Sequence, residues 1–162
     1  MTDRPQKIDK GHFNIIIKKD GSWYHEGIKI ERLPLVKLFA SVLKKEGERY
    51  LLETPAEKGE ITVEDAPFVA VEMTRTGSGE NQLLTFRTNL DEEITAGTGH
   101  DIRVIFDAVS GEPRPYIHVR NGLDARIERS VFYHLAGIIE PSPDDQKTQG
   151  VWSRGQFYKL EM

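Results

Sequence analysis

The pattern of apolar and polar residues in the first third of the chain predicts a series of short β-strands and one helix. Strict alternation predicts short β-strands, and a spacing of three and four residues predicts a helix. The elements are a strand at residues 13–17, a turn at Asp20-Gly21, a strand at 23–30, a helix at 35–45 and a strand at 50–53. This series predicts a β-β-α-β unit.

The helix in this series is marked by five apolar residues on one stripe: Leu35, Leu38, Phe39, Val42 and Leu43. Pro34 suits the first turn of a helix, because a proline there loses no hydrogen bond. Lys44 and Lys45 suit the last turn, where cations interact favourably with the helix dipole. The pattern therefore predicts that the helix ends at residue 45.

A second series repeats this order near the end of the chain. Its elements are a strand at 102–106, a turn at Ser110-Gly111, a strand at 116–120, a helix at 124–138 and a closing strand at 157–161. That last segment belongs to a predicted final strand at 151–160, after a break of linker composition at 140–147. The shared order indicates a fold built by duplication.

The residues between the two series favour β-structure. Residues 68–73 and 82–88 predict a hairpin around Gly77-Ser78-Gly79-Glu80, with Leu84 and Phe86 facing inward. Residues 61–63 are expected to pair back on the strand at 50–53. We therefore predict an α+β protein: two β-β-α-β repeats with roll-like antiparallel sheets, each packed by one helix, joined by an extra β-hairpin.

The domain organisation follows from these elements. Residues 1–11 are polar and without periodicity, which predicts a flexible arm. Residues 12–63 form the N-terminal repeat, and residues 64–162 form the hairpin plus the C-terminal repeat.

Composition narrows the function classes. With 38% apolar residues in 162, the chain can build a core. The net charge of −4 argues against nucleic-acid binding, and the absence of cysteine excludes thiolate catalysis and disulfides. The N-terminus has no secretory signal and no apolar run is long enough to span a membrane, so we expect a cytoplasmic protein without membrane contact.

Three strings carry a resemblance to a known family. Residues 115–125 (PYIHVRNGLDA), 63–68 (VEDAPF) and 21–27 (GSWYHEG) resemble domain-of-unknown-function family 1285, a group of small bacterial proteins. The resemblance covers about residues 21–138. It implies a mixed fold with repeated structural motifs, a signalling or ligand-sensing role, and no established catalytic residues to carry over.

Strand alternation points to one candidate site. Tyr116, His118 and Arg120 share one face of their strand, and Arg103 of the neighbouring strand is expected to face the same way. Arg87 is outward-facing on the middle hairpin. Arginines beside a histidine and a phenol could bind a phosphate or a carboxylate. The alternative is a solvated sheet face on which Arg103 and Arg120 pair with Asp107 and Glu112.

Other candidate chemistry is weaker. Asp65, next to Glu64, is the acidic residue that we rank first, as a partner for one of the arginines. The five histidines show no metal-ligand spacing, and the helical His134 is expected to pack partly buried. The glycine-rich turns at residues 77–80 and 97–100 lack the following helix that a phosphate loop requires. No cofactor and no metal are therefore expected.

Three functions stay open at this point. The first is a non-enzymatic ligand-binding or signalling module that recognises a small anionic ligand or a partner protein. The second is a hydrolase or transferase that uses His118 with an acidic residue such as Asp65 or Asp107. The third is a structural or scaffold protein. A homodimer is compatible with each, since two-fold homodimers are the commonest oligomers.

Overall fold

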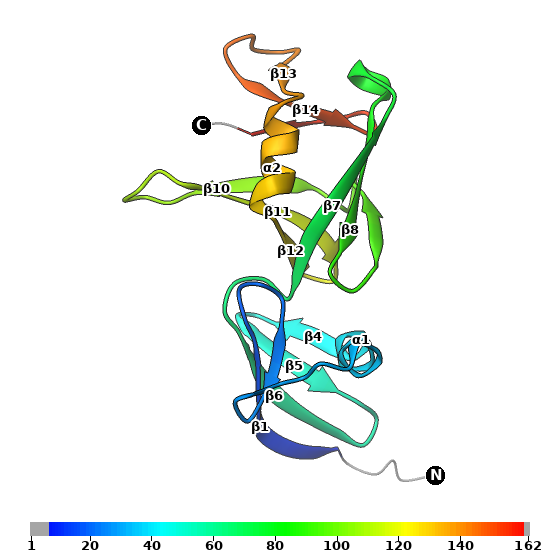
Figure 1. The fold of residues 1–162 in the computed structure, drawn as a ribbon, viewed down its shortest axis with the longest axis vertical. Helices are drawn as coiled ribbons and strands as arrows, with labels where there is room; N and C mark the ends of the chain where they lie inside the picture. Colours follow the sequence, from blue (N-terminus) through cyan, green and yellow to red (C-terminus); the bar gives the residue numbers. More distant parts are fainter. Residues whose placement is uncertain (1–6, 161–162) are drawn as a thin grey trace. The chain divides into compact units, whose positions relative to one another are not determined.

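The computed structural model describes residues 7–160. Contacts between residues divide the chain into two units, residues 1–67 and residues 68–162, called unit 1 and unit 2 below. Most of each unit is β-structure, and each contains one α-helix within the described residues (Figure 1). The predicted α+β class is confirmed in this broad sense.

Unit 1 is built on a six-stranded sheet with the order β3-β2-β1-β6-β5-β4. Its elements are β1 (Ile8–Ile17), β2 (Trp23–His25), β3 (Ile28–Lys29), α1 (Leu33–Ser41), β4 (Leu43–Glu46), β5 (Arg49–Glu53) and β6 (Glu57–Val63). Two antiparallel meanders, β1-β2-β3 and β4-β5-β6, meet where β1 and β6 run parallel. Helix α1 connects the two meanders.

Unit 2 repeats this strand order. Its large sheet has the order β10-β11-β12-β7-β8-β9, and β7 and β12 run parallel at its centre. The strands are β7 (Phe68–Thr76), β8 (Leu83–Thr88), β9 (Glu93–Thr95), β10 (Ile102–Phe106), β11 (Pro113–Arg120) and β12 (Leu123–Ile127). A single 3-10 turn, η1 (Gly79–Asn81), lies between β7 and β8.

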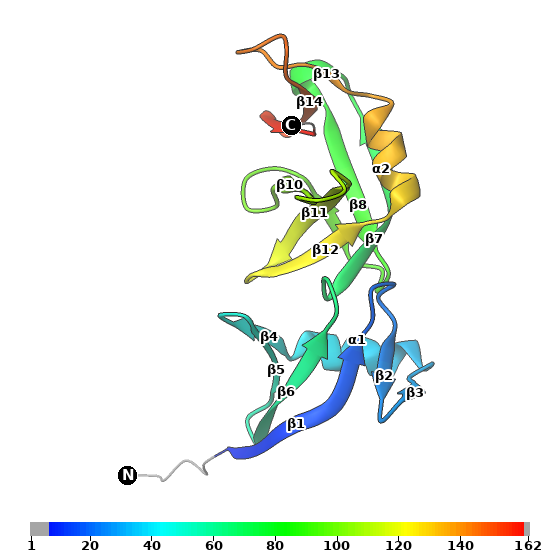
Figure 2. The ribbon, with the colours of Figure 1, turned by 90° about the vertical axis from the view of Figure 1, so that its left-hand side faces the viewer.

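The chain then forms α2 (Arg129–Ala136), which follows β12 and packs along β7 (Figure 2). A three-stranded antiparallel sheet completes unit 2, with strands β13 (Glu140–Pro141), β14 (Gln149–Ser153) and β15 (Gln156–Lys159). It contacts the large sheet at β8 and β10.

A repeat of two halves is confirmed, but its unit differs from the predicted one. Adding six to each strand number of the first sheet gives the order of the second sheet, read from its opposite edge. Strand β10, expected to match β1, therefore corresponds to β4, and the counterpart of β1 is β7. The sheets are also mixed rather than purely antiparallel, because each has a parallel pair at its centre.

Two boundaries in unit 1 differ from the predictions. Helix α1 ends at Ser41, and Leu43–Glu46 form strand β4. The ladder with β5 stabilises this strand, which buries Leu43 and places Lys44 within 2.6 Å of Glu53. The arm was expected to reach residue 11, but Ile8 and Asp9 already pair with β6; residues 1–6 lie outside the described residues.

Two boundaries in unit 2 also differ. The predicted helix at 124–138 begins only at Arg129, because Leu123–Ile127 form strand β12, and His134 on that helix is exposed. The predicted final strand is a hairpin, β14-β15. Its two-residue turn, Arg154-Gly155, has positive φ at both positions, as type I′ hairpin turns require.

Each unit buries its own apolar core. In unit 1 the largest fully buried side chains are those of Ile17 and Trp23. In unit 2 the fully buried residues include Phe68, Leu84, Phe86 and Leu135. The inward orientation predicted for Leu84 and Phe86 is confirmed.

Candidate functional site

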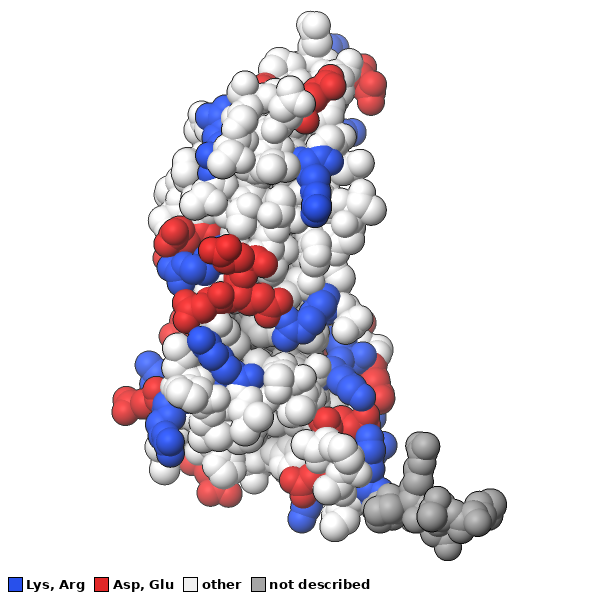
Figure 3. Space-filling model, turned by 90° about the vertical axis from the view of Figure 1, so that its right-hand side faces the viewer, with Lys and Arg blue, Asp and Glu red and all other residues white. Residues whose placement is uncertain are grey.

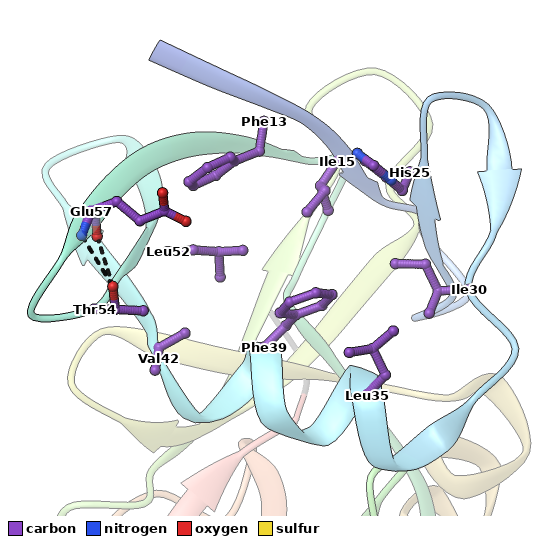
Figure 4. Close-up of a pocket in the computed structure, with 10 residues that line it drawn as sticks. All are labelled: Phe13, Ile15, His25, Ile30, Leu35, Phe39, Val42, Leu52, Thr54 and Glu57. Carbon is purple, nitrogen blue, oxygen red and sulfur yellow. Dashed lines mark hydrogen bonds between the residues drawn. The ribbon is translucent and has the colours of Figure 1, made fainter. Parts of the chain in front are cut away.

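A concave apolar pocket of about 330 Å³ lies within unit 1. Helix α1 forms one wall with Leu35 and Phe39, and β1 forms the opposite wall with Phe13 and Ile15 (Figure 4). The remaining lining residues are His25, Ile30, Val42, Leu52, Thr54 and Glu57. A volume of this size lies at the lower end of the range for small-molecule sites.

Phe39, in the α1 wall of the pocket, packs against a buried tryptophan. The indole of Trp23, which is 1% exposed, stacks on Phe39 with ring centroids 6.2 Å apart. Val36 and Ala40 are the buried residues of α1, which leaves Leu35 and Phe39 on the side of the pocket. The spacing of apolar residues that formed the helix thus also supplies two surfaces, one for the core and one for the pocket.

The opposite wall depends on irregularities in β1. The ladder between β1 and β6 shifts register on both sides of His12, and Asn14 has a φ of 58°. The imidazole of His12 holds this bend, since its Nδ1 accepts the backbone N–H of Asn14 at 2.9 Å and its Nε2 lies 2.9 Å from the Thr62 hydroxyl. Phe13, next in the chain, lines the pocket.

The polar groups of the pocket lie near its two ends. Thr54 and Glu57 occupy one end, and His25 lies near the other with Ile30 (Figure 4). Between them, the lining is aliphatic and aromatic. The arrangement can hold a molecule with an apolar body and one polar group.

Sequence reasoning missed this pocket. Its lining comes from β1, α1, β5, β6 and the connections between them, which only the fold brings together. One signal was available: the helical stripe Leu35, Phe39 and Val42 continues past the residues that the core uses.

The predicted site in unit 2 is partly assembled. Arg103 and Tyr116 are cross-strand partners on β10 and β11, and Arg126 is the partner of Tyr116 on β12. Both guanidinium groups lie over the Tyr116 ring, 4.8 Å and 5.5 Å from its centroid. Arg103 also donates a 2.6 Å hydrogen bond to Asp124.

The other two arginines of this set are also in ion pairs. Arg120 donates to both carboxylate oxygens of Glu92, at 2.6 and 2.7 Å. Arg87 donates to Glu72 and Asp91, and its hydrogen bond to Glu72 is the main reason why the pKa of Arg87 is raised above its ordinary value. Arg103 and Arg120 therefore pair with Asp124 and Glu92, not with the expected Asp107 and Glu112.

His118 is tied to the backbone. Its Nδ1 lies 2.9 Å from the carbonyl oxygen of Gly99, and its Nε2 lies 3.1 Å from the N–H of Gly122. A carbonyl only accepts and an N–H only donates, so the ring is neutral with its proton on Nδ1. Both nitrogens are occupied in holding two turns.

Asp65 lies in unit 1, half-buried in the connection between β6 and β7. The five other predicted site residues, Arg87, Arg103, Tyr116, His118 and Arg120, belong to unit 2. The proposed pairing of Asp65 with one of the arginines remains a prediction.

The surface charges in Figure 3 and the metal-ligating side chains of residues 7–160 indicate no further site. Lys and Arg lie among Asp and Glu on the face in Figure 3, without one large basic area. Within residues 7–160, no three His, Asp or Glu side chains are grouped so that they could hold a metal ion. In the same residues, neither α-helix is long and apolar enough to cross a membrane.

The chain is thus a two-unit, β-rich protein, and the large sheet of each unit consists of two meanders joined by a parallel pair. Residues 4–66 match the N-terminal domain of unknown function DUF1285, and residues 67–160 match the C-terminal domain of the DUF1285 protein of unknown function. The chain belongs to the DUF1285 family.

Solved structures agree with this assignment. A DUF1285 family protein from Silicibacter pomeroyi DSS-3 is 42% identical, with a TM-score of 0.89 over 97% of this chain and 84% of the other. A DUF1285 family protein from Shewanella baltica OS155 is 25% identical, with a TM-score of 0.59 over 76% of this chain and 91% of the other. No curated protein matches the chain.

Proposed function

We propose that this protein is a non-enzymatic ligand-binding module, and that unit 1 holds a small, mainly apolar molecule in its pocket. The observation that carries the proposal is the hollow between α1 and β1, with apolar walls and few polar groups. Burying apolar surface drives binding, and a small number of polar groups fixes orientation. A signalling role fits such a module, since a bound ligand would bridge a helix and a sheet.

The anion-binding interpretation of unit 2 has less support. An incoming phosphate would compete with Asp124 for Arg103, with Glu92 for Arg120, or with Glu72 and Asp91 for Arg87. Each displaced carboxylate would lose a charge-assisted hydrogen bond. We therefore place the ligand in unit 1.

The enzymatic interpretation has less support for a similar reason. A general acid or base needs a ring nitrogen that can reach the substrate. Using His118 in this way would break its hydrogen bond to Gly99 or to Gly122, and with it the support for a turn.

A fluorescence titration tests the proposal. N-phenyl-1-naphthylamine, which is uncharged at pH 7, is titrated into the full chain. We expect saturable binding that Val42→Phe and Leu35→Phe each weaken by about tenfold, equal to about 1.4 kcal/mol. Both substitutions add a ring to a half-buried lining position.

The matched control is Val109→Phe, because Val109 is 97% exposed in unit 2. It should leave the affinity unchanged. Circular dichroism establishes that each variant is folded. The absence of saturable binding to the folded chain, or an affinity of both pocket variants equal to that of the wild type, would overturn the proposal.

A further inference from the structure

We infer that the occupant of the pocket carries a protonated amine that lies against the carboxylate of Glu57. This inference rests on the proposed function and names the chemical class of its ligand. It commits to a small alkyl or arylalkyl amine, with the hydrocarbon part along Leu52, Phe39 and Leu35.

The position of Glu57 is fixed by a tight turn. Its backbone N–H donates to the Thr54 hydroxyl at 3.1 Å, and its carbonyl accepts the Thr54 N–H at 2.8 Å. As the first residue of β6, it also pairs with Ile8 of β1. The backbone that carries this carboxylate therefore needs little ordering when a ligand binds.

The Thr54 hydroxyl is already in use. It accepts N–H groups from Ala56 and Glu57 and donates to the carbonyl oxygen of Glu57. The carboxylate of Glu57 is therefore the acceptor that a ligand meets at this end. Figure 4 shows it on the side of the pocket near Phe13 and Leu52.

The charge of Glu57 is weakly compensated. Its ion pair within residues 7–160 is with Lys10, whose Nζ lies 3.9 Å away, and both side chains are almost half exposed. The neighbouring Glu53, by contrast, has Lys44 at 2.6 Å and Lys7 at 3.2 Å. Exposed pairs at such distances contribute little, so Glu57 can accept a closer cation.

The opposite end of the pocket imposes no such charge. His25 has an imidazole that is 54% exposed, with its Nε2 4.0 Å from Glu26. A ligand carboxylate placed at the Glu57 end would meet a like charge beside an apolar wall, where screening by water is reduced. Charge complementarity thus favours an amine over an acid of the same size.

Three probes of equal chain length separate these cases: octylamine, 1-octanol and octanoate. Each competes with N-phenyl-1-naphthylamine on the full chain at pH 7. We expect octylamine to bind at least about tenfold more tightly than octanoate, with 1-octanol between them. The advantage of octylamine over 1-octanol should shrink as salt is added, because salt screens the charge pair.

Two variants assign the effect to Glu57. Glu57→Gln should reduce octylamine binding to the level of 1-octanol and leave 1-octanol unchanged. Lys10→Met, which does not alter the turn, should strengthen octylamine binding because it removes the competing cation. Glu26→Gln, beside His25 at the other end, is the matched control and should change none of the three affinities.

The outcomes separate this inference from the proposed function. If neither the dye nor any probe binds, the proposed function fails. If 1-octanol or octanoate binds as tightly as octylamine, or if Lys10→Met does not strengthen octylamine binding, the pocket remains and the amine assignment is overturned.

Discussion

The ring of Phe13 lies against the backbone of Gly59: a Cβ atom at position 59 would be 2.4 Å from Cε2 of Phe13. Gly59 is buried in β6, and the Phe13 side chain from β1 crosses it at the wall of the pocket. The absence of a side chain at residue 59 therefore sets how deep the pocket is on this side.

Gly59→Ala should displace the Phe13 ring and change the affinity of the pocket. Because a ring at the end of a side chain can move, we expect a stability loss of about 1 kcal/mol, at the low end for overpacking. The N-phenyl-1-naphthylamine affinity should change by about threefold, equal to about 0.65 kcal/mol. Gly137→Ala is the control, since a Cβ there would come no closer than 3.4 Å to its neighbours.

Gly150→Ala should be far more damaging. A Cβ at this position of β14 would lie 2.1 Å from the carbonyl oxygen of Tyr158, a backbone atom that cannot turn aside. We expect a loss of about 3 kcal/mol in the free energy of unfolding, at the high end for overpacking, measured by urea denaturation. A loss no greater than that of Gly137→Ala would contradict the packing of β14 on β15.

Ser153→Ala tests the attachment of the β14-β15 hairpin to the large sheet of unit 2. The buried Ser153 hydroxyl accepts the N–H of Leu84 at 3.0 Å and donates to the carbonyl of Ala96 at 2.8 Å. Its removal leaves two buried backbone groups without partners, which costs about 1–3 kcal/mol. Ser130→Ala, at an exposed position of α2, should be neutral in the same urea titration.

Acid should destabilise the protein partly through Asp20. The hydrogen bond from the Ser22 hydroxyl, then that from the Ser22 N–H, lowers the pKa of Asp20 in the folded state. A lowered pKa stabilises the fold above the pKa of the unfolded chain, near 3.9, and this stabilisation is lost as pH falls through the folded value. Between pH 5 and pH 2, Asp20→Asn should lose less stability than the wild type; an equal loss would contradict this role.

The hairpins of this fold could be predicted from local sequence. The Asp20-Gly21, Glu26-Gly27 and Ser110-Gly111 turns lie where glycine supplies a positive φ. The same signal was present at Asn121-Gly122, which joins β11 to β12 with positive φ at both residues. Alternation of buried Leu123, Ala125 and Ile127 also marked β12 as a strand.

The sheet order could not be predicted in this way. The parallel pairs β1–β6 and β7–β12 join residues about 50 apart, and only tertiary packing selects them. Leu43 fits both the helical stripe and a buried strand position, so the pattern alone could not place the end of α1.

The two candidate sites also differ in how much of each could be predicted from local sequence. Strand alternation correctly placed Arg103 beside Tyr116, because that relationship is set by the hairpin. The acidic partners Glu92 and Asp124 were not identified, since Glu92 lies in the turn between β8 and β9 and Asp124 lies in a segment taken for a helix. The pocket of unit 1 depends on elements that are distant in sequence and needed the fold itself.

The central claim is that unit 1 binds a small apolar molecule between α1 and β1. Methyl-labelled NMR of the full chain during an N-phenyl-1-naphthylamine titration tests it most directly. The account predicts saturable shifts for the methyl groups of Leu35, Val42 and Leu52, with those of Leu84 and Leu123 in the core of unit 2 unchanged. Unchanged spectra for the three pocket residues at saturating dye would contradict it.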